Sequence, residues 1–305
     1  MNIISFSEIE GLHISPSTCI EWARTAIKEK QVYKLPPKTS IKFNNSLSFF
    51  TSMPSMLPSR GVYGVKVVSR LPERIPSLKA DILLYDIQSG ELLALMDGTW
   101  ITAYRTGAVA SVTIDMLSQG RGVYSFIGLG NTARTTLICL DEIYSHADLQ
   151  IYLYAYKNQH CAFMERFKDR PNIHFTVFEN IHQMIQRSDV VISCVTATND
   201  VLADFSDFKE NVLVVPIHTR GFQNCDLLFD HIFCDDIGHI SGFKYFKQYK
   251  SVTEMTDILN RSQPVPIGRK LAYNVGVSSQ DIFFAERIYA ILREKDSLLN
   301  KKFWV

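Results

Sequence analysis

The stretch GVYSFIGLGNTA, residues 122–133, decides the fold class. Residues 123–127 form an apolar run typical of a buried strand, a Gly-Leu-Gly turn follows, and a helical pattern begins at Asn131. A strand, a glycine turn and a helix in this order indicate a βαβ unit that binds a dinucleotide.

The turn matches the pattern G-x-G-x-x-A, in which each small residue has its own purpose. The first glycine permits the tight turn, the second lets the backbone approach a pyrophosphate at the positive end of the helix, and the alanine allows close packing of helix and strand. The alternative is a tight turn in an α/β protein that has no cofactor, but the strand–turn–helix context favours a cofactor. The predicted pyrophosphate site consists of Gly128, Gly130, Asn131, Thr132 and Ala133.

The segment after the second strand bears on the choice of coenzyme. Residues 149–154 read as this strand, and Ala155, Tyr156 and Lys157 follow it without the acid that binds the ribose of NAD. A small residue followed by a cation leaves room for a 2′-phosphate, which favours NADP(H) over NAD(H). Lys157 could equally be an exposed loop lysine.

Strands and helices continue to alternate along the middle of the chain. This alternation predicts a parallel sheet with helices on both faces, and hence an α/β fold. The expected strands are 123–127, 149–154, 174–177, 190–195 and 212–216, and the expected helices are 131–144, 161–168 and 181–187.

The N-terminal part of the sequence has a different pattern, with short strand-like runs in place of alternating strands and helices. A short strand is expected at residues 3–6, and a helix follows Ser15, which is an N-cap residue before a proline at the first helical position. Strand-like runs end in a predicted antiparallel hairpin of residues 81–86 and 92–96, joined by a Gln-Ser-Gly-Glu turn. Helices are expected at 101–119 and, near the end of the chain, at 280–293.

The composition limits the classes of function. The 305 residues include 32 Lys and Arg against 31 Asp and Glu, so the formal net charge is +1 and no basic surface for nucleic acid is indicated. No apolar run approaches the roughly 18 residues that span a bilayer, so no membrane association is expected. The six scattered cysteines suggest a reducing cytoplasm, and neither they nor the histidines have the spacing of metal ligands.

The sequence of residues 96–108, MDGTWITAYRTGA, contains the element T-x-x-R-T-x-A about 20 residues before the glycine turn. This arrangement resembles the ornithine cyclodeaminase/μ-crystallin family, and similarity extends over nearly the whole chain. It includes Met53-Pro54, the segment Gly64-Val65-Lys66, residues 195–198 and residues 276–281.

The resemblance implies both a fold and an activity. A Rossmann domain of residues 120–274 is inserted into an α+β substrate and dimerisation domain, formed by residues 1–119 and completed by residues 275–305. Family members transfer hydride between NAD(P) and the α-carbon of an amino or imino acid, and we expect a homodimer that acts on such a small molecule. The resemblance also places Thr106, Val195, Thr196, Ala197 and Gly276 at the cofactor.

Four residues match positions of the family that bind substrate. Arg105 matches the arginine that grips the substrate carboxylate, and Lys66 matches the active-site lysine. Ser77 falls where a hydroxyl touches the substrate, and Lys38 replaces a second carboxylate-binding arginine. Taken alone, Arg105 could cap a helix and Lys66 could extend from a sheet towards solvent.

Two carboxylates of the cyclodeaminase pattern are missing. Thr51 replaces a glutamate two residues before Met-Pro, and His218 replaces an aspartate in the loop after residues 212–216. Without both carboxylates, a substrate ammonium loses its partners, which argues against ornithine. His218 could still transfer protons or simply pack in its loop, and Arg220 could bind a second substrate carboxylate.

The leading hypothesis is an NAD(P)-dependent oxidoreductase that reduces an imine or oxidises an amine beside a carboxylate. A true cyclodeaminase, which forms proline and ammonia from ornithine with His218 in place of the aspartate, is the alternative within the enzymes. A cofactor-binding protein without catalysis is the third reading.

Overall fold

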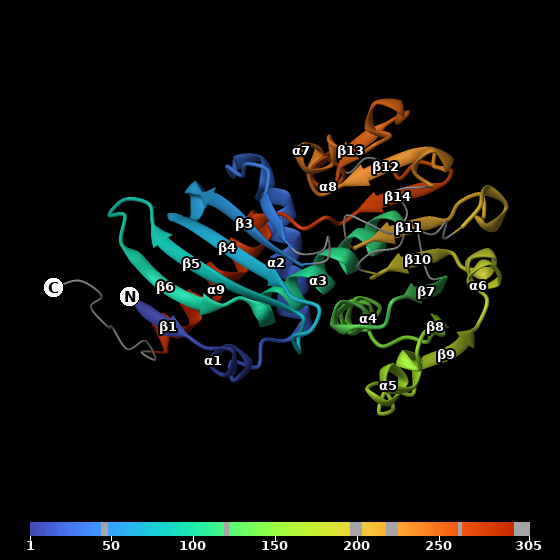
Figure 1. The fold of residues 1–305 in the computed structure, drawn as a ribbon, viewed down its shortest axis with the longest axis horizontal. Helices are drawn as coiled ribbons and strands as arrows, with labels where there is room; N and C mark the ends of the chain where they lie inside the picture. Colours follow the sequence, from blue (N-terminus) through green and yellow to red (C-terminus); the bar gives the residue numbers. More distant parts are fainter. Residues whose placement is uncertain (44–47, 119–121, 196–202, 218–224, 262–263, 296–305) are drawn as a thin grey trace. The chain divides into compact units, whose positions relative to one another are not determined.

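The computed structural model describes residues 1–43, 48–118, 122–195, 203–217, 225–261 and 264–295 (Figure 1). It divides into two compact units, of which unit 1 comprises Met1–Arg105 with Val277–Val305 and unit 2 comprises Thr106–Gly276. The first division falls inside helix α3 (Thr99–Leu117), whereas the family resemblance implied a boundary after residue 119.

Unit 1 contains a six-stranded sheet in the order β1-β6-β5-β4-β3-β2. Its pairs are antiparallel except for β1 with β6, and the predicted hairpin is confirmed as β5 and β6. Helix α9 packs on β3, β4 and β5 and also on α2 (Figure 1). The strands are β1 (Asn2–Ile4), β2 (Thr39–Phe43), β3 (Ser48–Leu57), β4 (Val62–Arg70), β5 (Leu78–Asp86) and β6 (Leu92–Asp97), and the helices are α1 (Phe6–Glu10), α2 (Pro16–Lys28) and α9 (Ser278–Glu294).

The start of the chain confirms one expectation and corrects another. The Ser15 side chain accepts a hydrogen bond from the Thr18 N–H at the start of α2, as the Ser-Pro signal predicted. The first strand, however, ends at Ile4 and not at residue 6. Ser5 and Glu8 form a reciprocal capping box that starts α1 at this point, and local capping therefore overrides the apolar run.

Unit 2 contains an eight-stranded sheet in the order β13-β12-β14-β11-β10-β7-β8-β9, and its recorded pairs are all parallel. The predicted α/β fold with a parallel sheet is thereby confirmed. The strands are β7 (Val123–Ile127), β8 (Leu149–Tyr154), β9 (Ile173–Phe178), β10 (Val190–Ser193), β11 (Leu213–Pro216), β12 (His231–Cys234), β13 (Val252–Glu254) and β14 (Lys270–Tyr273). Besides α3, the helices are α4 (Asn131–Ile143), α5 (Gln159–Glu165), α6 (Ile181–Arg187), α7 (Ile237–Ile240) and α8 (Met255–Arg261).

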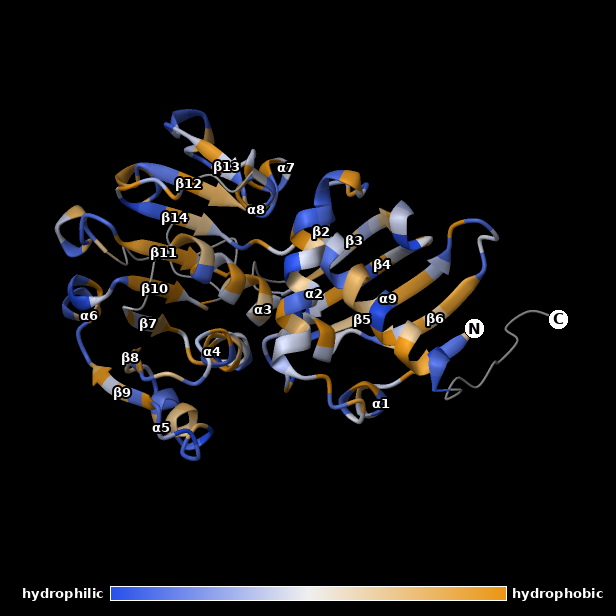
Figure 2. Cartoon of the chain, turned by 180° about the vertical axis from the view of Figure 1, so that it is seen from behind, coloured by the Kyte–Doolittle hydropathy of each residue, from blue (hydrophilic) through white to orange (hydrophobic). Residues whose placement is uncertain are grey.

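The central strands of unit 2 are apolar along most of their length, as Figure 2 shows for β7, β10 and β11. Every residue of β10 and β11 is buried. Strands buried on both faces are expected in a parallel sheet, and they explain why the sequence signal here is continuous rather than alternating.

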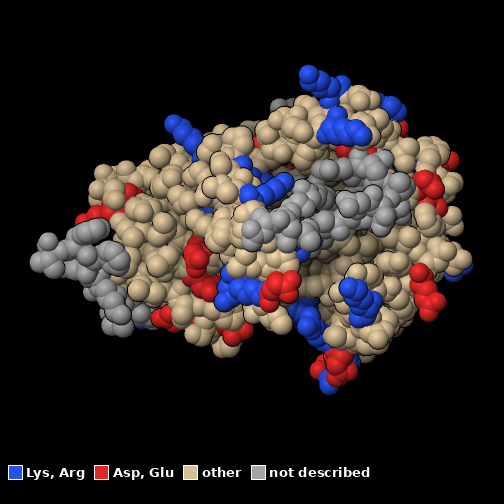
Figure 3. Space-filling model, viewed as in Figure 1, with Lys and Arg blue, Asp and Glu red and all other residues tan. Residues whose placement is uncertain are grey.

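On the face shown in Figure 3, basic and acidic side chains are interspersed, in line with the near balance of charges in the sequence. None of the helices in the described part of the chain has the length and apolarity needed to cross a membrane.

Candidate active site

The glycine turn after β7 requires its first glycine for two reasons. Gly128 has a φ of +83°, which side chains other than hydrogen rarely tolerate. A Cβ atom at this position would also lie 3.0 Å from the carbonyl carbon and oxygen of Cys194, which follows β10. Gly128 therefore holds two neighbouring strand ends together at the carboxyl edge of the sheet.

The second glycine, unlike the first, has open space around it. Gly130 is the N-cap residue of α4, has an ordinary φ of −83°, and makes no side-chain cap. Among the described residues, nothing lies within 4 Å of the place where its Cβ would stand. The start of α4 thus presents backbone N–H groups towards open space, which is the arrangement that accepts a phosphate.

The other residues of the turn follow the prediction in part. Ala133 is fully buried beneath the turn. The sequence did not single out two further side chains. Arg134 donates from Nε to Oδ1 of Asn131 at 3.1 Å, and Gln159 accepts from the Leu129 N–H at 3.4 Å. Arg134 brings a positive charge to the first turn of α4, where it would add to the attraction for an anion.

The remaining predicted cofactor residues in unit 2 are spread over four segments. Ala155, Tyr156 and Lys157 follow β8, and Thr106 is a buried residue of α3. The Gly276 N–H donates to buried Asp235 at 2.9 Å. Val195 follows Cys194 beside Gly128, whereas Thr196 and Ala197 lie outside the described residues.

Unit 1 buries an ion triad. The Asp281 carboxylate, on α9, lies 2.7 Å from Lys66 Nζ through Oδ2 and 2.7 Å from Arg105 Nε through Oδ1. Lys66 comes from β4 and Arg105 from α3, and all three side chains are almost inaccessible to solvent. The structure therefore brings together the two cations that the sequence predicted as catalytic residues.

The surroundings of Lys66 lower its pKa. Burial of the ammonium lowers the pKa of Lys66 to about 7, and the Asp281 carboxylate opposes this shift. The positive charges of Arg105 and Lys38 add to the lowering. A lysine with this pKa can hold or release a proton near neutral pH, which an ordinary surface lysine does not do.

The other predicted substrate residues differ in position. Lys38 lies close enough to influence Lys66, and Thr51 is buried on β3 with its Oγ1 2.8 Å from Ser40 Oγ. Ser77 is half-buried before β5, where its carbonyl oxygen accepts from the Leu71 N–H at 2.9 Å. His218 and Arg220 lie outside the described residues.

Asp281 is the member of the triad that sequence reasoning did not identify as a site residue. Its segment, residues 276–281, was noted only as part of the family resemblance. An aspartate in the first turn of an amphipathic helix is usually an exposed residue that interacts with the helix dipole. Its full burial, at 0% exposure, was the missing information.

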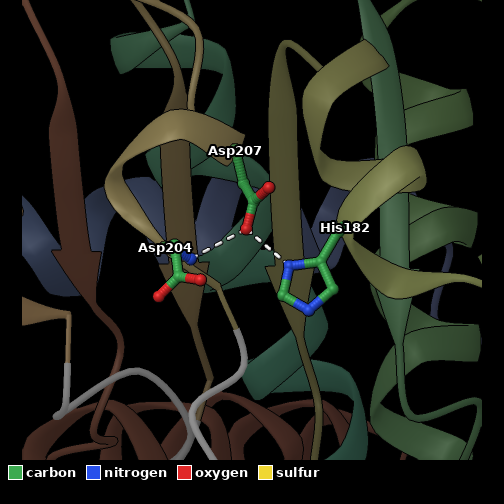
Figure 4. Close-up of side chains that lie close together, drawn as sticks. All are labelled: His182, Asp204 and Asp207. Carbon is green, nitrogen blue, oxygen red and sulfur yellow. Dashed lines mark hydrogen bonds and ion pairs between the residues drawn. The ribbon is translucent and has the colours of Figure 1, made fainter.

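One other cluster in unit 2 combines a histidine with two acids (Figure 4). His182 Nδ1 lies 2.6 Å from Oδ2 of Asp207, which also accepts from the Asp204 N–H at 2.8 Å. Asp204 and Asp207 form the capping box of a short 3-10 helix, Phe205–Asp207. Helix capping accounts for the contact between the two acids, and we assign no ligand to the cluster.

Comparison with known proteins places these features in a family. The Ornithine cyclodeaminase/mu-crystallin family model matches residues 2–214. The chain belongs to this family.

Relatives and solved structures support the assignment. A Δ1-pyrroline-2-carboxylate reductase of Bacillus cereus is 25% identical over 243 residues, which cover 73% of this chain and 74% of that protein. The fold is similar to that of Thermococcus litoralis Δ1-pyrroline-2-carboxylate reductase in complex with NADH and L-proline, with a TM-score of 0.83, 24% identity, and coverage of 99% and 100% of the two chains. It is also similar to an archaeal alanine dehydrogenase dimer with bound NAD, with a TM-score of 0.82, 20% identity, and coverage of 100% and 99%.

The open space around Gly130 predicts that a substitution here weakens coenzyme binding without unfolding the protein. Gly130→Val should fold with a melting temperature near that of the wild type, because its side chain meets open space, but should bind NADPH at least about tenfold more weakly, or about 1.4 kcal/mol. Fluorescence titration with NADPH measures the affinity. Gly242→Val, at another glycine of unit 2 with open space around it, is the matched control and should bind normally. Unchanged affinity in folded Gly130→Val would exclude the turn as the pyrophosphate site.

Proposed function

We propose that this protein is an NAD(P)-dependent oxidoreductase that reduces a small cyclic imino acid at the carbon bearing its carboxylate. The observation that carries the proposal is the buried triad, in which Lys66 and Arg105 share the carboxylate of Asp281. With Lys66 protonated, these three side chains hold one excess positive charge. Buried charge without a partner is costly, and a substrate carboxylate would supply the partner.

Arg105 is suited to hold that carboxylate. Its recorded contact with Asp281 uses Nε. A guanidinium bound in this way has two Nη groups for a second acceptor, and such a pair grips a carboxylate through parallel hydrogen bonds. Two bonds fix the orientation of the adjacent α-carbon, which a single ion pair does not.

Lys66 is suited to handle the proton. Reduction of a C=N bond adds a hydride to carbon and a proton to nitrogen, and NAD(P)H supplies the hydride when it is bound. A lysine with a pKa of about 7 can donate the proton at neutral pH and take another from solvent afterwards. His218 is proposed as a further proton-transfer residue, and Arg220 as a ligand for a second carboxylate.

The residues proposed for the site disfavour a substrate with a second ammonium group. Thr51, where cyclodeaminases have a glutamate, offers only a hydroxyl bonded to exposed Ser40, and the Asp281 carboxylate is already bound to two cations. A cyclic imino acid requires no acid for its side chain. The reductase named among the relatives and the L-proline in the Thermococcus complex support the same substrate class.

Spectrophotometric assays test the proposal. The wild-type protein should oxidise NADPH or NADH stoichiometrically when Δ1-pyrroline-2-carboxylate is added, and should form proline. L-Ornithine with oxidised coenzyme is the comparison substrate and should release no ammonia, because Thr51 cannot bind its side-chain ammonium as the glutamate of the cyclodeaminases would. Ammonia release from ornithine without turnover of the imine would overturn the reductase in favour of a cyclodeaminase.

For the coenzyme we propose a preference for NADP(H). Ala155 follows β8 without a carboxylate, and Lys157 is an exposed cation two residues later. Its Nζ lies 5.2 Å from the centre of the Tyr156 ring, so the side chain lies back over its neighbour within this segment. An acid at position 155 would bind ribose hydroxyls and repel a 2′-phosphate.

Ala155→Asp should therefore reverse the preference. We expect the wild type to bind NADPH more tightly than NADH, and the variant to bind NADH more tightly, as measured by calorimetry. Ala155→Ser adds a polar group without charge and should leave the wild-type order intact. Tighter binding of NADH by the wild type would disprove the proposed preference.

We also propose a homodimer joined through the sheet of unit 1. Strand registers align Pro54, Val65, Leu83, Leu95 and Ile3 in one row across five strands. All five are only partly buried or exposed, since α9 packs on the opposite face, where Gly64 contacts it. An apolar row of this kind commonly marks an interface, and the archaeal relative of similar fold is a dimer.

Light scattering tests the assembly. The wild type should have about twice the 34.8 kDa mass of one chain, and Leu83→Glu should reduce the mass to that of one chain, because it places a charge in the row. Lys79→Glu, an exposed position on the same strand, should remain dimeric. A wild-type mass of 34.8 kDa would refute the dimer. We propose a cytoplasmic location, a reducing compartment that suits six free cysteines.

A further inference from the structure

Helix α9 lies unusually close to β4 at the position of Asp281. A Cβ atom at Gly64 would stand 2.5 Å from Cδ1 of Ile282, so a side chain at this position would have to displace the end of the Ile282 side chain. Gly64 and Lys66 share one face of β4, and Ile282 is the neighbour of Asp281. The contact between Gly64 and Ile282 thus places α9 directly against β4 beside the ion pair of Asp281 and Lys66.

A second contact fixes the start of the same helix. The Ser278 hydroxyl donates to the Pro54 carbonyl oxygen on β3 at 2.7 Å. Ser278 and Asp281 lie three positions apart and thus on one side of α9, which faces the sheet. The carboxylate is held by a helix anchored to two strands, so its position is defined independently of any ligand.

Asp281 itself has no free carboxylate oxygen for a substrate. Oδ2 lies 2.7 Å from Lys66 Nζ, and Oδ1 lies 2.7 Å from Arg105 Nε. Burial of two cations and an acid is a poor means of stabilising a fold, because apolar residues of similar volume often serve better. The arrangement is more easily explained by what it does to the two cations.

We propose, on the basis of the function proposed above, that Asp281 is a positioning residue that orients Arg105 through Nε and keeps the Lys66 ammonium in place for the substrate carboxylate. By occupying Nε, the carboxylate directs the two Nη groups away from itself. By pairing with Nζ, it retains a charge that burial would otherwise remove. Both effects act on the substrate through another residue.

The charges around Lys66 determine in which direction its pKa should shift when a neighbour is removed. The groups acting on it are Asp281 from α9, Arg105 from α3 and Lys38 from the segment before β2. Of these, only the carboxylate raises the pKa of Lys66, whereas burial and both cations lower it. Removal of the acid and removal of Arg105 should therefore shift the pKa of Lys66 in opposite directions, which general loosening of the structure would not do.

The direct test is NMR titration of Lys66 in the full-length protein without ligand. Lysine labelled at Cε and Nζ gives the signal, and Lys66→Arg assigns it. Asp281→Asn should lower the pKa of Lys66 by roughly one unit or more, and Arg105→Gln should raise it. Asp81→Asn removes an exposed acid of β5 and is the matched control, which should leave the titration unchanged. An unchanged pKa in folded Asp281→Asn would overturn the proposal.

Kinetics provide a second readout. In the wild type, kcat/KM for the imino acid should fall as pH rises through about 7, because the proton on Lys66 is lost. In Asp281→Asn this limb should move to lower pH, and kcat/KM near neutral pH should fall by roughly 10²-fold through misorientation. Asp281→Glu keeps the charge and should restore the position of the limb, with a partial loss of kcat. A loss in Asp281→Asn that is equal at every pH would contradict the proposal.

These outcomes separate the proposal from the proposed function. If the wild type reduces no imino acid but the Lys66 titration shifts as expected, the function fails and the role of Asp281 stands. If Asp281→Asn does not fold, two other measurements test the positioning role. They are the shift of the Lys66 pKa in Arg105→Gln and the position of the limb in the pH profile of kcat/KM for Asp281→Glu. A lowered pKa in Arg105→Gln, or a displaced limb in Asp281→Glu, would then reject the positioning role.

Discussion

The proposed substrate site depends on the contact of one buried carboxylate with two buried cations. Asp281 reaches Lys66 and Arg105 from α9, which contacts β4 where Ile282 lies against Gly64. The C-terminal helix is therefore part of the proposed substrate site. It also explains why residues after the Rossmann domain return to unit 1, since without them the two cations would lie buried beside each other without an acid.

In the glycine turn of unit 2, the two glycines have different surroundings. Gly128 is constrained by its φ and by the nearby Cys194 backbone, while Gly130 has free space around it and leaves the start of α4 without a side-chain cap. The first glycine is required by the backbone conformation, and the second leaves open space at the start of α4, where we propose that the pyrophosphate binds.

Sequence reasoning succeeded where the determining interactions are local. The Gly128 turn, the Ser15 cap and the β5–β6 hairpin each depend on residues a few positions apart. It failed at α1, where an apolar run hid a capping box, and at Asp281, whose partner Arg105 is 176 positions away. Long-range burial of a polar side chain leaves no local pattern, and the family resemblance identified the two cations without the acid that holds them.

The central claim is that Lys66 and Arg105, held by Asp281, form a receptor for a substrate carboxylate. A crystal structure of the protein with NADP⁺ and L-proline tests it most directly. The account predicts that the proline carboxylate lies within about 3 Å of the Arg105 Nη atoms and Lys66 Nζ, with the Asp281 contacts retained. Electron density that places this carboxylate elsewhere, without contact to either cation, would contradict the account.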